Sequence, residues 1–421
     1  MSENEKNKKC FIVMAAVIVC FAFSPPQAGA DTSLEKAKLL ASDGAASDYF
    51  GRSVSISGDY AIVGAGYDDD KGTDSGSAYI FRWDGTSWSQ QQKLTASDGA
   101  DSDFFGYSVS ISGDYAIVGA YGDADNGSSS GSAYIFRWDG TSWSQQQKLL
   151  ASDSNAGDRF GFSVSISDDY AIVGAAYDSD KGTRSGSVYI FKQDGASWSQ
   201  QQKITASDGS ALDIFGGSVS ISGDYAIVGA FFDDDKGTDS GSAYIFKLSD
   251  TSWDQQAKLT ASDGAASQIF GCSVSISGDY AIIGAYGYDG NGSSSGSAYI
   301  FRRDGTSWSQ QQKLIASDGA ASDYLGRTVS IGGNYAIVGA YGDDDKGTDS
   351  GSAYIFERVC PAADLSGDCF VNFVDFAIFS NQWLQSPGVP SADIAPLPNG
   401  DGIVNFLDLE IFADWWIDGT D

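Results

Sequence analysis

The chain has 421 residues, which is enough for two or three domains and a large core. Its 56 Asp and Glu residues against 25 Lys and Arg give a formal net charge of −31, which argues against nucleic acid or an anionic membrane as a partner because phosphate groups would be repelled. The absence of His excludes Ser-His-Asp and Cys-His triads and His-ligated zinc, so an enzyme would have to rely on carboxylates, Tyr or Lys.

Residues 1–30 have the pattern of a secretory signal peptide. Three Lys residues precede an apolar run from Phe11 to Phe23, and Ala28-Gly29-Ala30 supplies small residues for cleavage. The run is too short to span a bilayer. The sequence therefore predicts a secreted or cell-surface protein without a membrane span. In that oxidising space we expect a disulfide between Cys360 and Cys369 and a free Cys272.

Residues 31–359 consist of an internal repeat. An aromatic residue followed by Gly recurs every 55 residues, with Leu in the sixth copy: Phe50-Gly51, Phe105-Gly106, Phe160-Gly161, Phe215-Gly216, Phe270-Gly271 and Leu325-Gly326. Each unit has the alternation of four strands, at 53–57, 60–63, 77–81 and 88–94 in the first, and no helical period. Four antiparallel strands repeated at this period are typical of a propeller blade. We predict an all-β propeller of six blades, with seven as the alternative count.

The two ends of the repeat region are complementary in sequence. The sixth unit stops after its third strand at 352–356, while Lys36-Ala37-Lys38-Leu39-Leu40 resembles the end of the fourth strand in the other units. We expect this N-terminal segment to complete the sixth blade and close the ring.

The repeated landmarks resemble a known family. The Phe-Gly pair, the Val-Gly-Ala that ends the second strand and the Gly-Ser-Ala-Tyr-Ile-Phe of the third resemble FG-GAP repeats, the units of integrin-α-type propellers, over about residues 34–358. The resemblance implies adhesion or ligand binding. It also implies calcium loops between the first two strands, but Gly58-Asp59 is too short to wrap a cation, so those sites are not carried over.

Acidic residues cluster in a different loop, after Val-Gly-Ala, at 68–74, 233–239 and 343–349. Their oxygens suit Ca²⁺, but the same pattern is typical of solvated turns whose Asp side chains cap their own backbone. Near-identical repeats imply near-identical sites, and hence a multivalent face rather than one catalytic pocket. Exposed Trp and Tyr at the rim offer an alternative, because aromatic faces can stack on sugar rings.

Residues 360–421 contain two loops with the ligand spacing of an EF-hand. The first supplies oxygens from Asp364, Ser366, Asp368, the Phe370 carbonyl, Asn372 and Asp375. The second supplies Asn399, Asp401, the Ile403 carbonyl, Asn405 and Asp408, with Asp393 within reach of the first ligand position if the loop is enlarged. Short amphipathic segments follow at 376–384 and 409–417. We predict a small helical domain that binds Ca²⁺ as its cofactor.

This duplicated module resembles type I dockerin domains over residues 362–417. The resemblance implies calcium-dependent folding and docking to a cohesin on a scaffold or cell surface. It assigns partner contacts to loop positions 10 and 11, which are Phe373, Val374, Phe406 and Leu407 in this chain. These residues are apolar where hydroxyl residues are frequent, which puts the class of partner in doubt. The alternative is that calcium only holds a small, core-poor domain together.

Together these patterns predict a secreted, non-catalytic adhesion or ligand-binding propeller, attached by a calcium-binding dockerin-like domain to a cohesin-type scaffold or the cell surface. Its ligand would be an extracellular glycan or protein. A polysaccharide-active or carbohydrate-binding component of an extracellular degradative complex is one alternative, and a purely structural surface protein is another. Catalysis would need a carboxylate pair in the central funnel, and no unit breaks the repeat to supply one.

Overall fold

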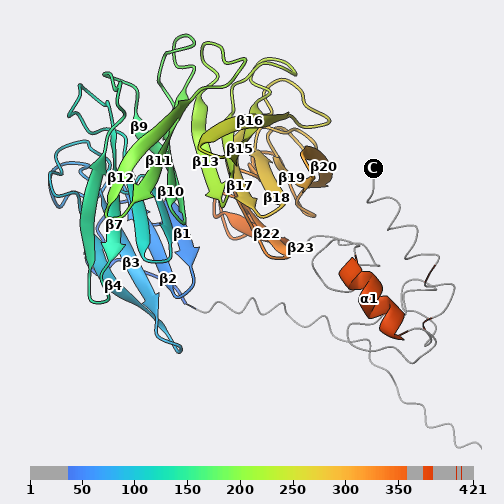
Figure 1. Cartoon of the computed structure of the whole chain (residues 1–421), viewed down its shortest axis with the longest axis horizontal. Coiled ribbons are helices and arrows are strands. Elements are labelled where there is room, and N and C mark those ends of the chain that lie inside the picture. The colour runs from blue at the N-terminus through green and yellow to red at the C-terminus, as the bar shows by residue number, and fades with distance from the viewer. Residues whose placement is uncertain (1–36, 358–372, 383–403, 405–408, 410–421) are drawn as a thin grey trace, which may run out of the picture. The chain divides into compact units, whose positions relative to one another are not determined.

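The computed structural model describes residues 37–357, 373–382, 404 and 409. Its contacts divide the chain into residues 1–39 and 40–421, and the fold described here belongs to the second unit. Residues 40–357 form six antiparallel sheets that follow one another in chain order, from blue to orange in Figure 1. The predicted all-β propeller of six blades is confirmed.

The strands of each blade are consecutive in the chain. The first blade contains β1 (Ser53–Ser57), β2 (Tyr60–Ala65), β3 (Ser77–Trp83) and β4 (Trp88–Leu94). The second contains β5 (Ser108–Ser112), β6 (Tyr115–Ala120), β7 (Ser132–Trp138) and β8 (Trp143–Leu149). The third contains β9 (Phe160–Ser167), β10 (Tyr170–Ala175), β11 (Ser187–Asp194) and β12 (Ser197–Ile204). The fourth contains β13 (Phe215–Ser222), β14 (Tyr225–Ala230), β15 (Ser242–Ser249) and β16 (Ser252–Leu259). The fifth contains β17 (Phe270–Ser277), β18 (Tyr280–Ala285), β19 (Ser297–Asp304) and β20 (Ser307–Leu314). The sixth contains β21 (Thr328–Gly332), β22 (Tyr335–Ala340) and β23 (Ser352–Glu357).

Local sequence explains the hairpin that opens each blade. In the first blade the antiparallel register places Ser57 opposite Tyr60, with a two-residue turn between them. Gly58 has a φ of 54°, in the left-handed region that a tight hairpin turn requires and that Gly adopts without strain. The following strand is almost entirely buried because both of its faces are covered, as expected for a strand inside a blade.

The hydrophobic core lies between neighbouring blades. Between the first two blades, Ile62 and Ile80 pack with Val109 and Ile111, and four further clusters repeat this arrangement around the propeller. Ile62 and Ile80 are both 0% exposed. Burial of apolar surface at these junctions therefore holds successive blades together.

The Phe-Gly pair inserts between the ends of two strands of the preceding blade. The Phe105 N–H donates to the Ser75 carbonyl at 3.0 Å, and the Phe105 side chain is fully buried. Gly106 has a φ of 92°, and a Cβ there would lie 2.1 Å from the Ser77 carbonyl oxygen. Both the backbone conformation and the close approach require Gly, which explains why this pair marks every repeat.

The sixth blade differs from the other five because its sheet has three strands in the described part of the chain. Within residues 37–40, which the sequence predicts to supply the fourth strand, the structure has no strand. That prediction is therefore not confirmed for the described residues. One apolar face of this blade is exposed, since Ile355 is 70% exposed whereas its counterpart in the first blade, Ile80, is fully buried.

Beyond the repeats, the structure describes one helix, α1 (Phe373–Gln382), which begins three residues before the segment predicted at 376–384. Its Phe379 side chain is buried. Within the described part of the chain, no helix has the length and apolar character needed to cross a bilayer.

Candidate functional site

A Lys side chain lies among three Asp side chains in each of the first four blades. In the fourth blade the Lys258 ammonium lies 2.7 Å from Asp208, 2.9 Å from Asp233 and 2.5 Å from Asp235. The Asp233 side chain is only 5% exposed and also accepts a hydrogen bond from the Tyr244 hydroxyl at 3.1 Å. The same set recurs as Lys93 with Asp43, Asp68 and Asp70, Lys148 with Asp98, Asp123 and Asp125, and Lys203 with Asp153, Asp178 and Asp180.

The charges in these clusters stabilise one another. Burial disfavours the charged form of Lys258, but hydrogen bonds to Asp208, Asp235 and Asp233 outweigh that effect and raise its pKa. Burial likewise opposes the charge of Asp208, but the hydrogen bond from Lys258 outweighs it and lowers the pKa of that carboxyl. Burial beside these carboxylates raises the pKa of Tyr244, which therefore remains a neutral donor.

The sequence leaves two interpretations of the acidic loops open, and the geometry bears on both. The carboxylates of Asp208, Asp233 and Asp235 lie close enough together to hold a metal ion, as do those of the matching set in the second blade. The Lys258 ammonium, however, already contacts all three carboxylates. The loop carboxylates also cap the backbone, since the Asp235 N–H donates to Asp233 at 3.1 Å. The cluster is thus a cation site filled by the chain's own Lys.

The fifth and sixth blades depart from this pattern. In the fifth, Tyr288 and Gly290 replace the two loop Asp residues, and Lys313 contacts Asp263 at 2.5 Å and lies 3.1 Å from the centre of the Tyr288 ring. In the sixth, Asp343 accepts a hydrogen bond from Tyr354 at 3.0 Å, and no described residue supplies a Lys.

Aromatic and Arg side chains form a second feature, which we call the aromatic–arginine surface. It consists of Tyr49, Arg52, Tyr67, Phe104, Tyr107, Tyr121, Arg159, Phe162, Tyr177 and Arg184. The rings follow one another across the first three blades, with centroid separations of 5.2 Å for Tyr67–Phe104, 4.9 Å for Phe104–Tyr121 and 5.8 Å for Tyr121–Phe162. These separations are those of favourable aromatic pairs, so the rings form a continuous array.

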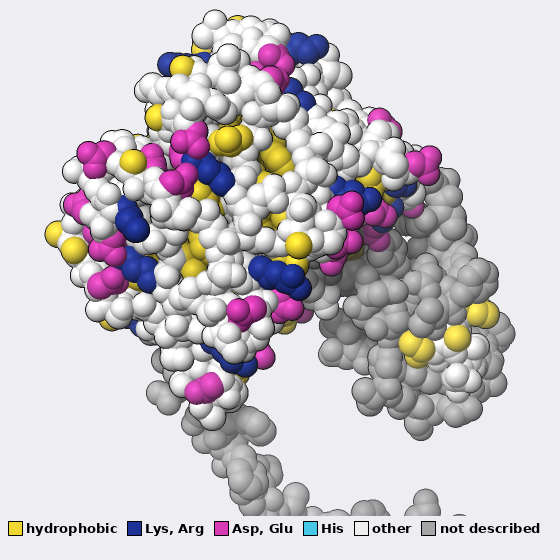
Figure 2. Space-filling view, turned by 60° about the vertical axis from the view of Figure 1, so that its left-hand side comes forward, with side chains coloured by type: hydrophobic (Ala, Val, Ile, Leu, Met, Phe, Trp, Pro, Cys, Tyr) yellow, Lys and Arg dark blue, Asp and Glu magenta, His cyan; other side chains and the backbone are white. Residues whose placement is uncertain are grey.

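Arg side chains lie against the rings of this array. The Arg52 guanidinium lies 4.7 Å from the Tyr107 ring and donates to its hydroxyl at 3.1 Å. Arg159 and Arg184 lie 4.1 and 4.9 Å from the Tyr177 ring. Such cation–π contacts hold each guanidinium in place. Figure 2 shows basic and acidic side chains lying beside one another over the surface of the propeller.

The aromatic–arginine surface differs from blade to blade although the framework does not. The residue after the Phe-Gly pair is Arg52, Tyr107, Phe162, Gly217, Cys272 and Arg327 in the six units. The residue before it is Tyr49, Phe104, Arg159, Ile214, Ile269 and Tyr324. A regular scaffold thus presents an irregular surface. The expectation of near-identical sites fits the Lys–Asp clusters of the first four blades. It does not fit the aromatic–arginine surface, which sequence analysis missed. The sequence feature that could have revealed this surface is the variation in residue type at fixed positions of otherwise matching repeats.

Most of the predicted C-terminal site residues lie outside the described residues. Phe373, Val374 and Asp375 fall in the first turn of α1. The residues outside are Asp364, Ser366, Asp368, Phe370, Asn372, Asp393, Asn399, Asp401, Ile403, Asn405, Phe406, Leu407 and Asp408, together with Cys360 and Cys369. Cys272 is free, as predicted, and burial raises the pKa of its thiol to about 11, so the thiolate is a minor form at neutral pH.

Comparison with family models identifies the repeats. Six segments match the FG-GAP repeat: residues 34–81, 88–136, 143–191, 198–246, 253–301 and 308–356. Together they cover more than half of the chain. From the second onward, each segment begins in the fourth strand of one blade and ends within the third strand of the following blade. A search among curated proteins found no match.

Proposed function

The chain belongs to the FG-GAP repeat family, and we propose that it is a secreted, non-catalytic propeller that binds an extracellular ligand through its aromatic–arginine surface. The observation that carries this proposal is the contrast between a framework that repeats and a surface that does not. Tyr49 and Arg52 are exposed, whereas their counterparts Ile214 and Cys272 in later blades are buried. The framework therefore does not require one residue type at these positions.

The chemistry of the surface supports binding. Tyr, Phe and Arg are the residue types enriched at the centres of protein interfaces, where large, rigid side chains contribute area at low entropic cost. The guanidinium groups are already oriented by the rings beneath them, so less freedom is lost when a ligand binds. An extracellular protein is therefore the ligand that this composition favours.

A carbohydrate is the second candidate. Tyr49, which belongs to the aromatic–arginine surface, is 60% exposed. Exposed rings of this kind offer apolar faces on which sugar rings can stack. The protein would then be the carbohydrate-binding component of an extracellular degradative complex.

The C-terminal region is proposed to attach the propeller. The two loops with EF-hand spacing at 364–375 and 397–408 support a Ca²⁺-dependent, dockerin-like domain, and the N-terminal pattern at 1–30 supports secretion. A cohesin-type domain on a scaffold or cell surface is the partner proposed for Phe373, Val374, Phe406 and Leu407.

Binding by the full chain to arrays of extracellular matrix proteins and of neutral and acidic polysaccharides tests the proposal. We expect at least one class to bind, and Arg52→Ala to weaken binding about tenfold. Arg82→Ala is the matched control, because Arg82 is also exposed and lies 5.6 Å from a Tyr ring outside this surface. An equal loss in both variants, or no binding on either array, contradicts the proposal.

Calorimetric titration of the full chain with Ca²⁺ tests the attachment domain. We expect two sites, and the loss of one site in each of the variants Asp364→Ala and Asp408→Ala. Unchanged binding in both variants would assign the calcium to the blades instead.

A further inference from the structure

Two Arg side chains of the third blade lie against the same aromatic ring. Arg159, which precedes β9, and Arg184, in the loop between β10 and β11, lie 4.1 and 4.9 Å from the centre of the Tyr177 ring. Within the described part of the chain neither guanidinium forms an ion pair, whereas Arg303 of the fifth blade pairs with Asp279. Two like charges are thus held beside one ring without a counter-charge, and an anionic group of a ligand would relieve their repulsion.

The loop that carries Arg184 has positive charge where other blades have negative charge. In the first blade its counterpart is Asp74, whose N–H donates to the Asp69 carboxylate at 2.7 Å. In the third blade the Arg184 N–H donates to the Ser179 hydroxyl at 3.1 Å, and its φ of 53° matches the 54° of Asp74. The turn is the same although a guanidinium and a hydroxyl stand in place of two carboxylates. The difference therefore changes what the loop can bind and not how it folds.

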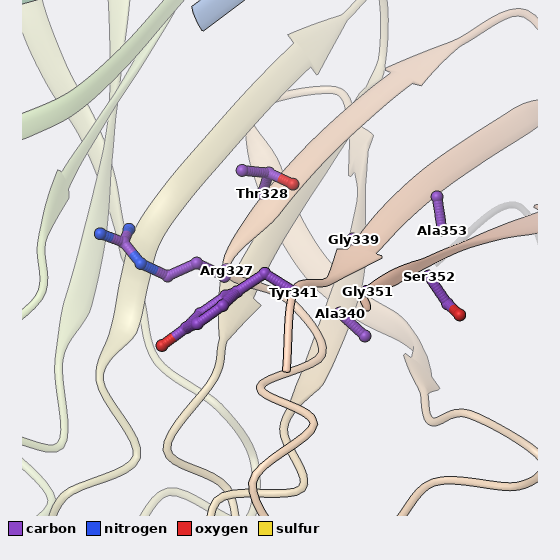
Figure 3. A pocket seen from close by; sticks show the side chains of 8 residues that line it. All are labelled: Arg327, Thr328, Gly339, Ala340, Tyr341, Gly351, Ser352 and Ala353. Carbon is purple, nitrogen blue, oxygen red and sulfur yellow. The ribbon is translucent and has the colours of Figure 1, made fainter. Parts of the chain in front are cut away.

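The sixth blade provides a contrast. Figure 3 shows its Arg327 and Tyr341 side chains extending in the same direction beside a cavity of about 390 Å³. Its loop keeps both carboxylates, Asp344 and Asp349, and Asp349 acts electrostatically on the same Tyr ring as Arg327 does. The positive charge of Arg327 is thereby offset by its own loop. In the third blade both loop positions lack a carboxylate, so the charge of the Arg side chains is not offset in this way.

An exposed aliphatic side chain lies beside Arg184. Leu212, in the segment that precedes β13 of the fourth blade, donates its N–H to the Thr183 carbonyl at 2.8 Å. The Ile214 N–H donates to the Arg184 carbonyl at 3.2 Å. These bonds place Leu212 against the loop of the third blade, and Leu212 is 54% exposed. Charged and aliphatic groups therefore meet at the junction of these two blades.

The backbone of Leu212 adopts a conformation that this residue type disfavours. Its φ is 75°, in the left-handed region where a Cβ lies too close to the following carbonyl oxygen. Neither this geometry nor burial in the core favours Leu here, which points to a contact made outside the chain. The counterparts in the other five blades are small residues, namely Ser47, Ser102, Gly157, Ser267 and Ser322.

We propose that the two Arg side chains beside Tyr177, together with Leu212, form the binding site for a short acidic segment of an extracellular protein. In that segment Asp or Glu residues lie next to an aliphatic or aromatic residue. The carboxylates pair with the guanidinium groups, and the apolar residue covers Leu212. This inference rests on the proposed function, because it names the chemistry of the partner that the aromatic–arginine surface binds.

The charge of the whole chain favours a short segment over an anionic polysaccharide. A net charge of −31 repels a polyanion that extends over the molecule. At physiological ionic strength, charges more than about 8 Å away are largely screened, so a short segment interacts mainly with the Arg side chains that it touches. A polysaccharide also has no aliphatic side chain with which to cover Leu212. An acidic protein segment is therefore the occupant that the site favours.

Fluorescence anisotropy of the full chain with two labelled probes tests the site. The first probe is a mixture of synthetic hexapeptides in which Glu alternates with Leu or Phe, and the second is hexagalacturonate. We expect the peptides to bind more tightly, and their binding to weaken as the salt concentration rises. Arg184→Asp and Leu212→Ser each introduce the residue type that other blades have at the same position, so both variants should fold. Each should weaken peptide binding about tenfold.

Each variant has a matched control. Arg82→Asp makes the same change in net charge at an exposed Arg outside the aromatic–arginine surface. Ile315→Thr removes an apolar side chain that is 47% exposed in the fifth blade, where the first blade has Thr95 at the same position. We expect neither control to weaken peptide binding. Equal losses in the variants and their controls overturn the inference.

Other outcomes also decide the question. Absence of peptide binding overturns the inference, and tighter binding of hexagalacturonate that depends on Arg184 assigns the site to an acidic polysaccharide instead. Failure of the inference is distinct from failure of the proposed function. An array ligand that Arg52→Ala weakens, but that Arg184→Asp and Leu212→Ser do not, would leave the proposed function in place and overturn this inference.

Discussion

The fourth and fifth blades surround structurally equivalent Lys side chains with very different charges. Lys258 contacts three carboxylates, and a fourth carboxyl, that of the buried Asp213, lies nearby in the same blade. Lys313 contacts Asp263 and the face of Tyr288. At the position of Asp213 the fifth blade has Gln268. The ammonium persists when most of the carboxylates are lost. This comparison teaches that the Lys keeps its position with a single carboxylate and an aromatic ring as partners, so the number of acidic residues around it can vary.

The largest expected effect comes from removing each Lys in turn. Lys258→Met leaves Asp233 buried without its counter-charge, so we expect the free energy of unfolding to fall by about 3 kcal/mol. Lys313→Met removes a pair with a half-exposed Asp263 and should cost about 1 kcal/mol or less. Urea denaturation of both variants measures the two losses in the free energy of unfolding. Equal losses would contradict the proposed difference between the fourth and fifth blades.

Calcium should distinguish a site filled by Lys from an open one. In the parent chain the ammonium competes with any ion, so added Ca²⁺ should not stabilise the fourth blade. In Lys258→Met the three carboxylates are free to bind Ca²⁺, and we expect recovery of about 2 kcal/mol of the lost stability at saturating ion. The control Lys258→Met/Asp235→Asn should recover less. All these proteins share the C-terminal loops, so a difference between them in stabilisation by Ca²⁺ comes from the fourth blade.

The buried carboxyl of the fourth blade should make stability depend on pH. Burial raises the pKa of Asp213 to about 6, above the usual value near 3.8. The folded state therefore binds more protons than the unfolded state between pH 4 and 6, and this group's contribution to stability is lost as pH rises through that window. Asp213→Asn keeps an oxygen to accept the Ser210 N–H and should gain about 1–2 kcal/mol at pH 7 but nothing at pH 4. A gain that does not vary with pH would contradict this account.

Restoring the consensus residue in the fifth blade should have the smallest effect. Tyr288→Asp places a carboxylate beside Lys313 and within reach of the Ser297 hydroxyl, which is buried without a hydrogen-bond partner in the described structure. In the fourth blade the equivalent Ser242 donates to Asp233 at 2.9 Å. We expect stabilisation of about 1 kcal/mol by heat denaturation. A loss of stability would show that the ring of Tyr288 is the better partner for Lys313.

The sequence predicts the blades well because strand alternation and the Phe-Gly pair recur at a fixed period, so each unit supports the assignment of the others. It predicts the acidic loops but not their partner. Lys258 lies 25 residues from Asp233 and 50 from Asp208, a contact that depends on strand pairing within the blade and on the segment that precedes it. The aromatic–arginine surface was missed for the same reason, since Arg52 and Tyr107 are brought together only by the packing of two blades.

The consecutive pairing of strands within each blade also affects how the chain reaches its native state. Units this similar could exchange strands, because a segment such as Tyr60–Ala65 has nearly the same residues as its five counterparts. Misassembly between like units is a characteristic failure of repeat proteins. Here each strand pairs with its immediate neighbour in the chain, so the correct partner closes a shorter loop than any copy one unit away. Each correct blade is therefore expected to form faster than a blade that has exchanged a strand with another unit.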